Sequence, residues 1–132
     1  GLSTGNTQAE LTQAVLEGVA FGLRDSLEAL RGAGAELDHL IAIGGGTGSA
    51  YWLRLIATVL NLPLHLPAGG EFGAALGAAR LGMAASSGAD VDDLMRAPEI
   101  AEVTEPARAL VPEYEAAYQR YRAAYPLILQ AQ

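Results

Sequence analysis

The fold is decided by the stretch LIAIGGGTGS at residues 40–49. Four apolar residues typical of a buried strand run into a cluster of glycines, and a helix is predicted to open near Ser49. In α/β proteins such a junction holds phosphates and adenosine, because glycines let the backbone approach a ligand and the helix start offers unpaired N–H groups. A tight turn from strand to helix also needs glycines. The stretch alone therefore leaves a binding role and a purely structural role equally open.

Two common phosphate-binding motifs do not match this stretch. A P-loop closes with Lys followed by Ser or Thr, and no lysine follows Gly48. The dinucleotide pattern G-x-G-x-x-G needs a glycine where the chain has Ser49, if the pattern starts at Gly44, or Tyr51, if it starts at Gly46. The acid expected at the end of the next strand is also missing, because residues 64–66 run into Pro67. A standard NAD site is not predicted.

Length and composition indicate one small folded domain, residues 1–132, with 51% apolar residues. A net charge of −7 with eight basic residues argues against nucleic acid or an anionic membrane surface as partner. No cysteine is present, so disulfides and cysteine metal sites are excluded. No apolar run has the length of a membrane span and no signal-peptide pattern opens the chain, so we expect a cytoplasmic protein. Because the first residue is Gly1, we expect part of a longer protein.

The first half of the chain predicts a helix followed by a β-α-β unit. Thr7 and Glu10 have the spacing of a capping box, and apolar residues then recur at helical intervals up to Gly32. Residues 37–43 predict a strand buried on both faces, residues 52–60 a second helix, and residues 62–66 a second strand. The two strands should be parallel, which gives an α/β fold that is rich in helix and has a small parallel sheet.

A third helix, residues 71–82, has a face with almost no side chains. Gly73 and Gly77 form this face together with Ala74 and Ala78. Glycine inside a helix costs about 1 kcal/mol relative to alanine, so another backbone or a bound ligand should approach here. Packing against another backbone is the favoured reading. Glu71 stands where a loop carboxylate could meet a ligand, although an acid at a helix start has the same sequence signature.

The last part of the chain predicts a short helical turn at residues 91–95, an extended segment at 100–104, and a helix from Pro112 that ends before Pro126. This helix carries four tyrosines at spacings of four, three and four: Tyr114, Tyr118, Tyr121 and Tyr125. Such a stripe is typical of a core or subunit contact, so a homodimer is one expectation, and it is seldom a surface for stacking ligands.

Other chemistry is not predicted. His39 and His65 each stand without a second histidine at the spacing of metal ligands, so neither a metal site nor a catalytic role is assigned to them. Ser49 is not in a G-x-S-x-G elbow, so a hydrolase triad has no support. No catalytic residue is assigned within this chain.

Taken together, these pieces closely resemble the carboxyl-terminal part of the FGGY family of carbohydrate kinases, and its xylulokinase members most of all. The resemblance spans nearly the whole chain and rests on the order of four segments: AVLEGVAF at 14–21, GGG at 44–46 with Ser49 and Trp52, Glu71 with GAALGAA at 73–79, and YQRYRAAYP at 118–126. Each segment alone is unspecific, but the combination is specific.

The resemblance implies part of an actin-like ATPase domain, of the ribonuclease H type, which forms the nucleotide side of a two-domain sugar kinase. It implies ATP-dependent phosphorylation of a ketopentose, D-xylulose to D-xylulose 5-phosphate. By position, Gly44, Gly45 and Gly46 would let the backbone approach ATP, and Ser49 would hydrogen-bond near the adenine. The catalytic base, the sugar-binding residues and most of the Mg²⁺ site would belong to sequence outside this chain.

The chain departs from the family pattern at two positions, Gly48, where a basic residue is common, and Thr58, where many members carry aspartate. Two alternatives to the kinase reading stay open. One is a non-catalytic α/β interaction module with a purely structural glycine turn, and the other is a different nucleotide-binding α/β domain.

Overall fold

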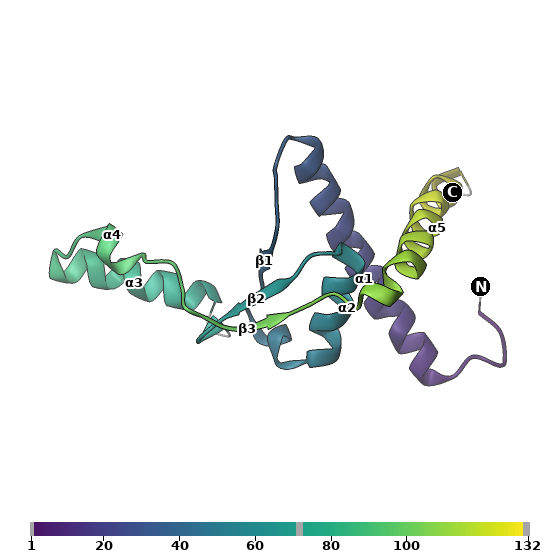
Figure 1. Cartoon of the computed structure of the whole chain (residues 1–132), viewed down its shortest axis with the longest axis horizontal. Coiled ribbons are helices and arrows are strands. Elements are labelled where there is room, and N and C mark those ends of the chain that lie inside the picture. Colours follow the sequence, from purple (N-terminus) through teal and green to yellow (C-terminus); the bar gives the residue numbers. More distant parts are fainter. Residues whose placement is uncertain (1, 71–72, 131–132) are drawn as a thin grey trace.

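The computed structural model describes residues 2–70 and 73–130, and in it three helices gather on one side of a small sheet (Figure 1). These are α1 (Gln8–Gly32), α2 (Ala50–Leu60) and α5 (Val111–Gln130). The predicted capping box is present, with the Thr7 side chain accepting from the Glu10 N–H and the Glu10 carboxylate accepting from the Thr7 N–H at 2.7 Å. The capping residues therefore fix the start of α1 as the sequence predicted.

The sheet contains β1 (Leu40–Ile41), β2 (Leu64–Pro67) and β3 (Ile100–Thr104) in the order β1-β2-β3. The expected parallel pairing of β1 with β2 is confirmed. The sheet as a whole is mixed, because β3 runs antiparallel to β2, so the expectation of a small parallel sheet holds for β1 and β2 only. The Ala68 N–H donates to the Glu99 carbonyl at 2.9 Å, so β3 begins beside the end of β2 and has to run back along it.

One face of the sheet packs against α2. Leu64 of β2 is buried with Leu53 and Ala57 of α2, and Leu40 and Leu66 pack against this group. The expected strand at residues 37–43 is reduced to two residues of regular pairing, although the Ala42 N–H still donates to the His65 carbonyl at 2.9 Å. The β-α-β unit thus holds the carboxyl ends of β1 and β2 side by side.

Helix α5 crosses α1 and contributes the centre of the core. Tyr118 is 2% exposed and lies among Ala20, Phe21 and Val59. Its hydroxyl donates to Asp25 Oδ1 at 2.6 Å, and the Arg24 guanidinium lies over its ring at 4.4 Å from the centroid. The prediction of a core role for the tyrosine stripe is confirmed for Tyr118.

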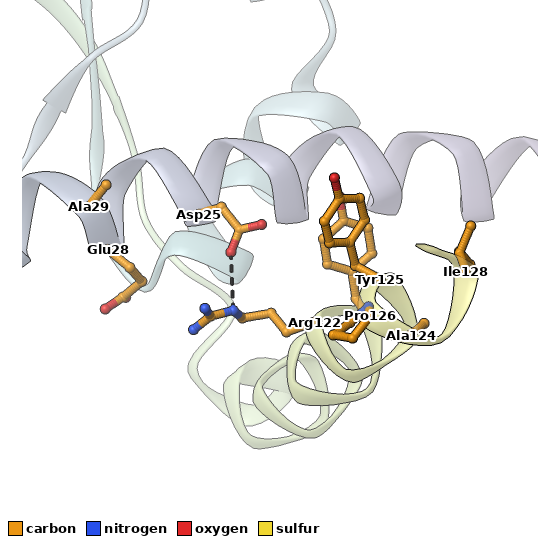
Figure 2. A pocket seen from close by; sticks show the side chains of 9 residues that line it. Asp25, Glu28, Ala29, Arg122, Ala124, Tyr125, Pro126 and Ile128 are labelled. Carbon is orange, nitrogen blue, oxygen red and sulfur yellow. Dashed lines mark ion pairs between the residues drawn. The ribbon is translucent and has the colours of Figure 1, made fainter. Parts of the chain in front are cut away.

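The predicted end of the last helix before Pro126 was wrong, because α5 continues to Gln130 with Pro126 inside it. A proline removes one backbone hydrogen bond and bends a helix, but the turns on either side keep their own bonds. A groove of about 830 Å³ runs between this end of α5 and α1. Figure 2 shows Arg122 reaching across it toward Asp25, 3.5 Å from Nε to Oδ1.

The buried contacts of α5 displace the pKa of two tyrosines upward. Burial, followed by the hydrogen bond to Asp25, raises the pKa of Tyr118 to about 12. Burial and the Glu17 carboxylate, which accepts from the Tyr114 hydroxyl, raise the pKa of Tyr114 to about 12 as well.

We predict that the free energy of unfolding falls at alkaline pH. The folded-state pKa of Tyr118 lies above its ordinary value of 10.0, so its contribution is complete below pH 10 and is lost as the pH rises toward 12. The expected loss is on the order of 2 kcal/mol, measured by urea unfolding at several pH values. Tyr118→Phe should flatten this part of the profile, and an unchanged slope in that variant would contradict the assignment.

Helix α3 (Gly73–Ser87) and the short α4 (Val91–Leu94) extend from the far end of the sheet, away from the other helices (Figure 1). Among the described residues of α3 none is buried, and a Cβ on Gly77 would have no neighbour within 4 Å. The expected packing of the Gly73 and Gly77 face against another backbone is therefore not found in the described part of the chain. Glu71 lies outside the described residues.

Candidate functional site

The glycine turn occupies the carboxyl end of β1 and leads into α2. It consists of Gly44 and a short 3₁₀ helix, η1 (Gly45–Gly48). Ser49 then caps α2, its hydroxyl oxygen accepting from the Trp52 N–H at 3.3 Å. The predicted start of a helix near Ser49 is confirmed, and the N-terminal N–H groups of α2 lie directly behind the turn.

The glycines of the turn differ in whether the structure requires a glycine at their positions. Gly44 has φ +95° and ψ 175°, a backbone conformation that only glycine adopts without strain. A Cβ on Gly46 would lie 3.5 Å from the indole ring of Trp52, an ordinary contact. Gly45 and Gly48 are exposed, have no positive φ, and would place a Cβ in open space. Only Gly44 is therefore required by the turn itself.

The glycine turn after β1 is held in place by the side chain of Thr47 and by a second glycine turn, Gly69 and Gly70, which follows β2. The Thr47 hydroxyl donates to the Gly44 carbonyl at 2.8 Å, and the Gly44 N–H donates to the Gly70 carbonyl at 2.9 Å. Gly70 follows β2, and a Cβ there would lie 2.9 Å from Cγ of Pro67. Sequence reasoning missed both contacts; the threonine three residues after Gly44 was the available signal.

Both glycine turns therefore lie at the carboxyl ends of the parallel strands β1 and β2. In open α/β sheets, ligands bind outside these ends of the strands. A hollow of about 190 Å³ lies here, lined by Ile43, Gly70, Gly73 and Arg80 among others. The half-buried Gly73 and Gly77 of α3 face this hollow, not a neighbouring backbone. This edge of the sheet presents exposed backbone and small residues. Such a surface is better suited to binding a flat ligand than to catalysis.

Thr58, one of the two departures from the family pattern, lies at the other end of α2, about 13 Å along the helix from Ser49. It is 2% exposed, donates to the Arg54 carbonyl at 2.6 Å and accepts from the Ala107 N–H at 3.0 Å. The bond from Ala107 ties the segment before α5 to α2. The change at Thr58 therefore concerns packing, and it leaves the glycine turn untouched.

The two histidines are neighbours, which the sequence did not predict. The rings of His39 and His65 stack with centroids 4.3 Å apart, and His39 Nδ1 lies 2.6 Å from Asp38 Oδ1. In the part of the chain that the structure describes, no three His, Cys, Asp or Glu side chains are grouped so as to hold a metal ion.

Within the same residues, no helix has the length and apolar character needed to cross a membrane.

Comparison with known proteins identifies the family. The model of the FGGY family of carbohydrate kinases, C-terminal domain, matches residues 1–86. The chain belongs to the FGGY family of carbohydrate kinases. The resemblance inferred from the four sequence segments is thereby confirmed.

Several of the similar proteins are named xylulose kinase. The chain is 38% identical to xylulose kinase of Escherichia coli over 66% of its own length and 18% of that protein. It is 36% identical to the probable L-xylulose kinase of Pasteurella multocida, covering 92% of the chain and 24% of that protein. The chain thus spans a quarter or less of these relatives.

Solved structures confirm the fold class. The crystal structure of a xylulose kinase from Brucella ovis matches all of this chain and 27% of its own, with a TM-score of 0.85 and 52% identity. The xylulose kinase from Rhodospirillum rubrum matches 98% of the chain with a TM-score of 0.78 and 29% identity. The helix-rich α/β chain is part of an actin-like ATPase fold, as the resemblance implied.

We predict opposite outcomes for alanine at two adjacent glycines. Gly44→Ala forces a side chain into the conformation reserved for glycine and should cost about 1–3 kcal/mol of stability. Gly45→Ala, its matched control, should change stability by less than about 0.5 kcal/mol, because its Cβ points into open space. Denaturant unfolding of both variants tests this. Equal losses at the two positions would show that the turn constrains both glycines.

Proposed function

We propose that the chain is the carboxyl-terminal part of an ATP-dependent sugar kinase and forms one wall of its ATP site. The observation that carries the proposal is the exposed Gly45 at the carboxyl edge of the parallel strands. Neither backbone strain nor packing requires a glycine at Gly45 or at Gly48, but a basic side chain is common in the family only at the position of Gly48, so close approach of a ligand is the reason we propose for the absent side chain of Gly45. An interaction module with a purely structural turn explains Gly44 and leaves Gly45 unexplained.

The residues of the turn fit a nucleotide better than a metal ion. Gly44, Gly45 and Gly46 offer backbone without side chains, and the start of α2 offers N–H groups and the positive end of the helix dipole. Ser49 uses its oxygen to cap α2, which leaves its O–H to donate to a ligand acceptor such as an adenine nitrogen. The turn supplies no carboxylate, so we propose that the Mg²⁺ ligands lie in other parts of the kinase.

ATP supplies the phosphoryl group when it is bound. The task of this chain is to hold and orient the nucleotide, because positioning and charge stabilisation provide most of the catalysis in phosphoryl transfer. A general base for the sugar hydroxyl is not among the residues at the turn. The base, the sugar site and the metal ligands therefore belong, in this proposal, to the remainder of a cytoplasmic two-domain kinase.

We propose D-xylulose as the sugar, phosphorylated to D-xylulose 5-phosphate. The support is the likeness to proteins named xylulose kinase, including the Brucella ovis structure at 52% identity. One relative is named probable L-xylulose kinase, so L-xylulose is the competing substrate. Turnover of the full-length enzyme with ATP and each sugar decides between them, and a higher kcat/KM for L-xylulose would overturn the choice.

We predict that the 132-residue chain alone has no kinase activity. With ATP, Mg²⁺ and D-xylulose it should show no turnover above background, because the turn provides no base and no metal ligand. A coupled assay of the chain and of the full-length enzyme checks this. Turnover by the isolated chain that disappears on mutation of the chain would contradict the division of the site between two parts.

A further inference from the structure

Gly44, the first residue of the glycine turn, is held by hydrogen bonds on both of its backbone polar groups. Its N–H donates to the Gly70 carbonyl at 2.9 Å. Its carbonyl accepts twice from Thr47, at 3.1 Å from the backbone N–H and at 2.8 Å from the hydroxyl. These bonds hold the backbone of Gly44 at φ +95° and ψ 175°. Thr47 therefore fixes the orientation of the peptide bond that joins Gly44 to Gly45.

This orientation directs the N–H of Gly45 out of the turn. The described part of the chain contains no cis peptide bond, and in a trans peptide the C=O and the N–H point in opposite directions. Since the Gly44 carbonyl points toward Thr47, the Gly45 N–H points away from Thr47. Among the described residues no acceptor is bonded to this N–H, and Gly45 is exposed. The turn thus presents a fixed backbone donor at the carboxyl end of β1.

Thr47 itself lies on the side of the turn that faces α1. It is half-buried and lines a groove of about 380 Å³ together with Leu23 of α1 and Trp52 of α2. The described lining of the hollow beside Gly70 does not include it. The proton of its hydroxyl is already donated to the Gly44 carbonyl. An effect of this hydroxyl on a ligand at the carboxyl ends of the strands therefore passes through Gly44.

We propose that Thr47 is a positioning residue of the nucleotide site, whose hydroxyl holds the Gly44 carbonyl so that the Gly45 N–H is aimed at an acceptor atom of the bound nucleotide. The inference rests on the proposed function, in which the glycine turn is one wall of the ATP site. A donor that is fixed before the ligand arrives loses less conformational entropy on binding, so the affinity for the nucleotide is higher.

Removal of the hydroxyl should loosen this peptide bond without unfolding the turn. The bond from the Thr47 N–H to the Gly44 carbonyl and the bond from the Gly44 N–H to the Gly70 carbonyl do not involve the side chain of Thr47, so both remain. The peptide that carries the Gly45 N–H then has more freedom to rotate. The loss should be seen in nucleotide binding before it is seen in the fold.

Steady-state kinetics of the full-length kinase test the proposal. Thr47→Val and Thr47→Ala remove the hydroxyl, and Thr47→Ser keeps it. Thr12→Val is the matched control, because the Thr12 hydroxyl makes the same kind of bond, to the Gln8 carbonyl at 3.0 Å, in an exposed part of α1. The KM for ATP, the KM for D-xylulose, kcat and the melting temperature are measured for each variant.

We expect Thr47→Val and Thr47→Ala to raise the KM for ATP by about 3- to 10-fold, the effect of one lost hydrogen bond. The KM for D-xylulose and kcat should stay within about twofold of the wild-type values, and the melting temperature should be nearly unchanged. Thr47→Ser should restore the KM for ATP to within about twofold of wild type, and Thr12→Val should behave as wild type.

An unchanged KM for ATP in folded Thr47→Val would overturn the proposal, as would a serine variant that behaves like the valine variant. A lower melting temperature with equal changes in both KM values, or failure of both hydroxyl-free variants to fold, would assign Thr47 a structural role only. Gly45→Val separates this inference from the proposed function. A raised KM for ATP in Gly45→Val beside wild-type kinetics in Thr47→Val would refute the positioning role alone, whereas an unchanged KM in both would refute the ATP wall as well.

Discussion

Tyr118→Ala should lower the free energy of unfolding by about 3–5 kcal/mol, the range expected when a buried aromatic side chain is truncated. Tyr118 is 2% exposed and lies against Phe21, with ring centroids 6.0 Å apart. Its removal opens a cavity between α1, α2 and α5. It also takes the hydroxyl from Asp25 and the ring from beneath Arg24, which is bound to Glu115 and the Val59 carbonyl.

A loss of this size is a large fraction of the 5–15 kcal/mol typical of a folded domain. Tyr125→Ala is the matched control, because Tyr125 is 64% exposed and its truncation should cost less than about 0.5 kcal/mol. Tyr121→Ala should fall between the two, since Tyr121 is 40% exposed and packs on Phe21 at 5.3 Å between ring centroids.

Urea unfolding and an ATP titration of the same variants check the assignment of the tyrosine stripe to packing. We expect the free energy of unfolding to fall while nucleotide affinity in the folded state stays within about twofold of the wild-type value. A large loss of ATP affinity in a Tyr118→Ala protein with an unchanged melting temperature would mean that the stripe binds the ligand.

The elements that the sequence predicted well are those set by neighbouring residues. The capping box at Thr7 and Glu10 placed the start of α1, and the run of glycines after residues 40–43 placed the turn into α2. The helical spacing of Tyr118 indicated a core position, and the structure confirms it. In each case the physical cause lies within a few residues of the feature, so one sequence is enough to reveal it.

Other features depend on residues far apart in the chain, and for these the sequence was insufficient. The direction of β3 follows from where α3 and α4 return the chain, and the stacking of His39 on His65 follows from the register of β1 beside β2. Pro126 was read as the end of α5 because local rules treat proline as a stop, yet the helix continues past it. The contact of Gly44 with Gly70 likewise joins two turns that the sequence presents separately.

The glycine turn could be located from the sequence, but the roles of its glycines could not. Sequence reasoning assigned Gly44, Gly45 and Gly46 the same task. The structure separates them, since Gly44 is required by its φ of +95° and Gly46 lies against Trp52. Gly45 alone of these three is free of both constraints, so it is the position at which the proposed ATP site and a structural turn make different predictions.

Gly45→Val in the full-length kinase should therefore raise the KM for ATP by about 10- to 100-fold, a loss of about 1.4–2.8 kcal/mol of nucleotide binding. The new side chain would occupy the space proposed for ATP, while the open surroundings of Gly45 allow the fold to persist. The KM for D-xylulose should change by no more than about twofold, because the sugar site lies elsewhere in the proposed kinase. Gly48→Val serves as the control, since Gly48 is also exposed and unconstrained, at a position where a basic side chain is common in the family.

The most direct test of the ATP-site proposal is the ratio of the two KM values, for ATP and for D-xylulose, in the Gly45→Val enzyme, with its melting temperature recorded alongside. We expect a selective rise in the KM for ATP, a nearly unchanged melting temperature, and wild-type kinetics for Gly48→Val. A folded Gly45→Val enzyme with unaltered ATP kinetics would rule out close approach of ATP to Gly45 and leave the glycine turn with a structural role only.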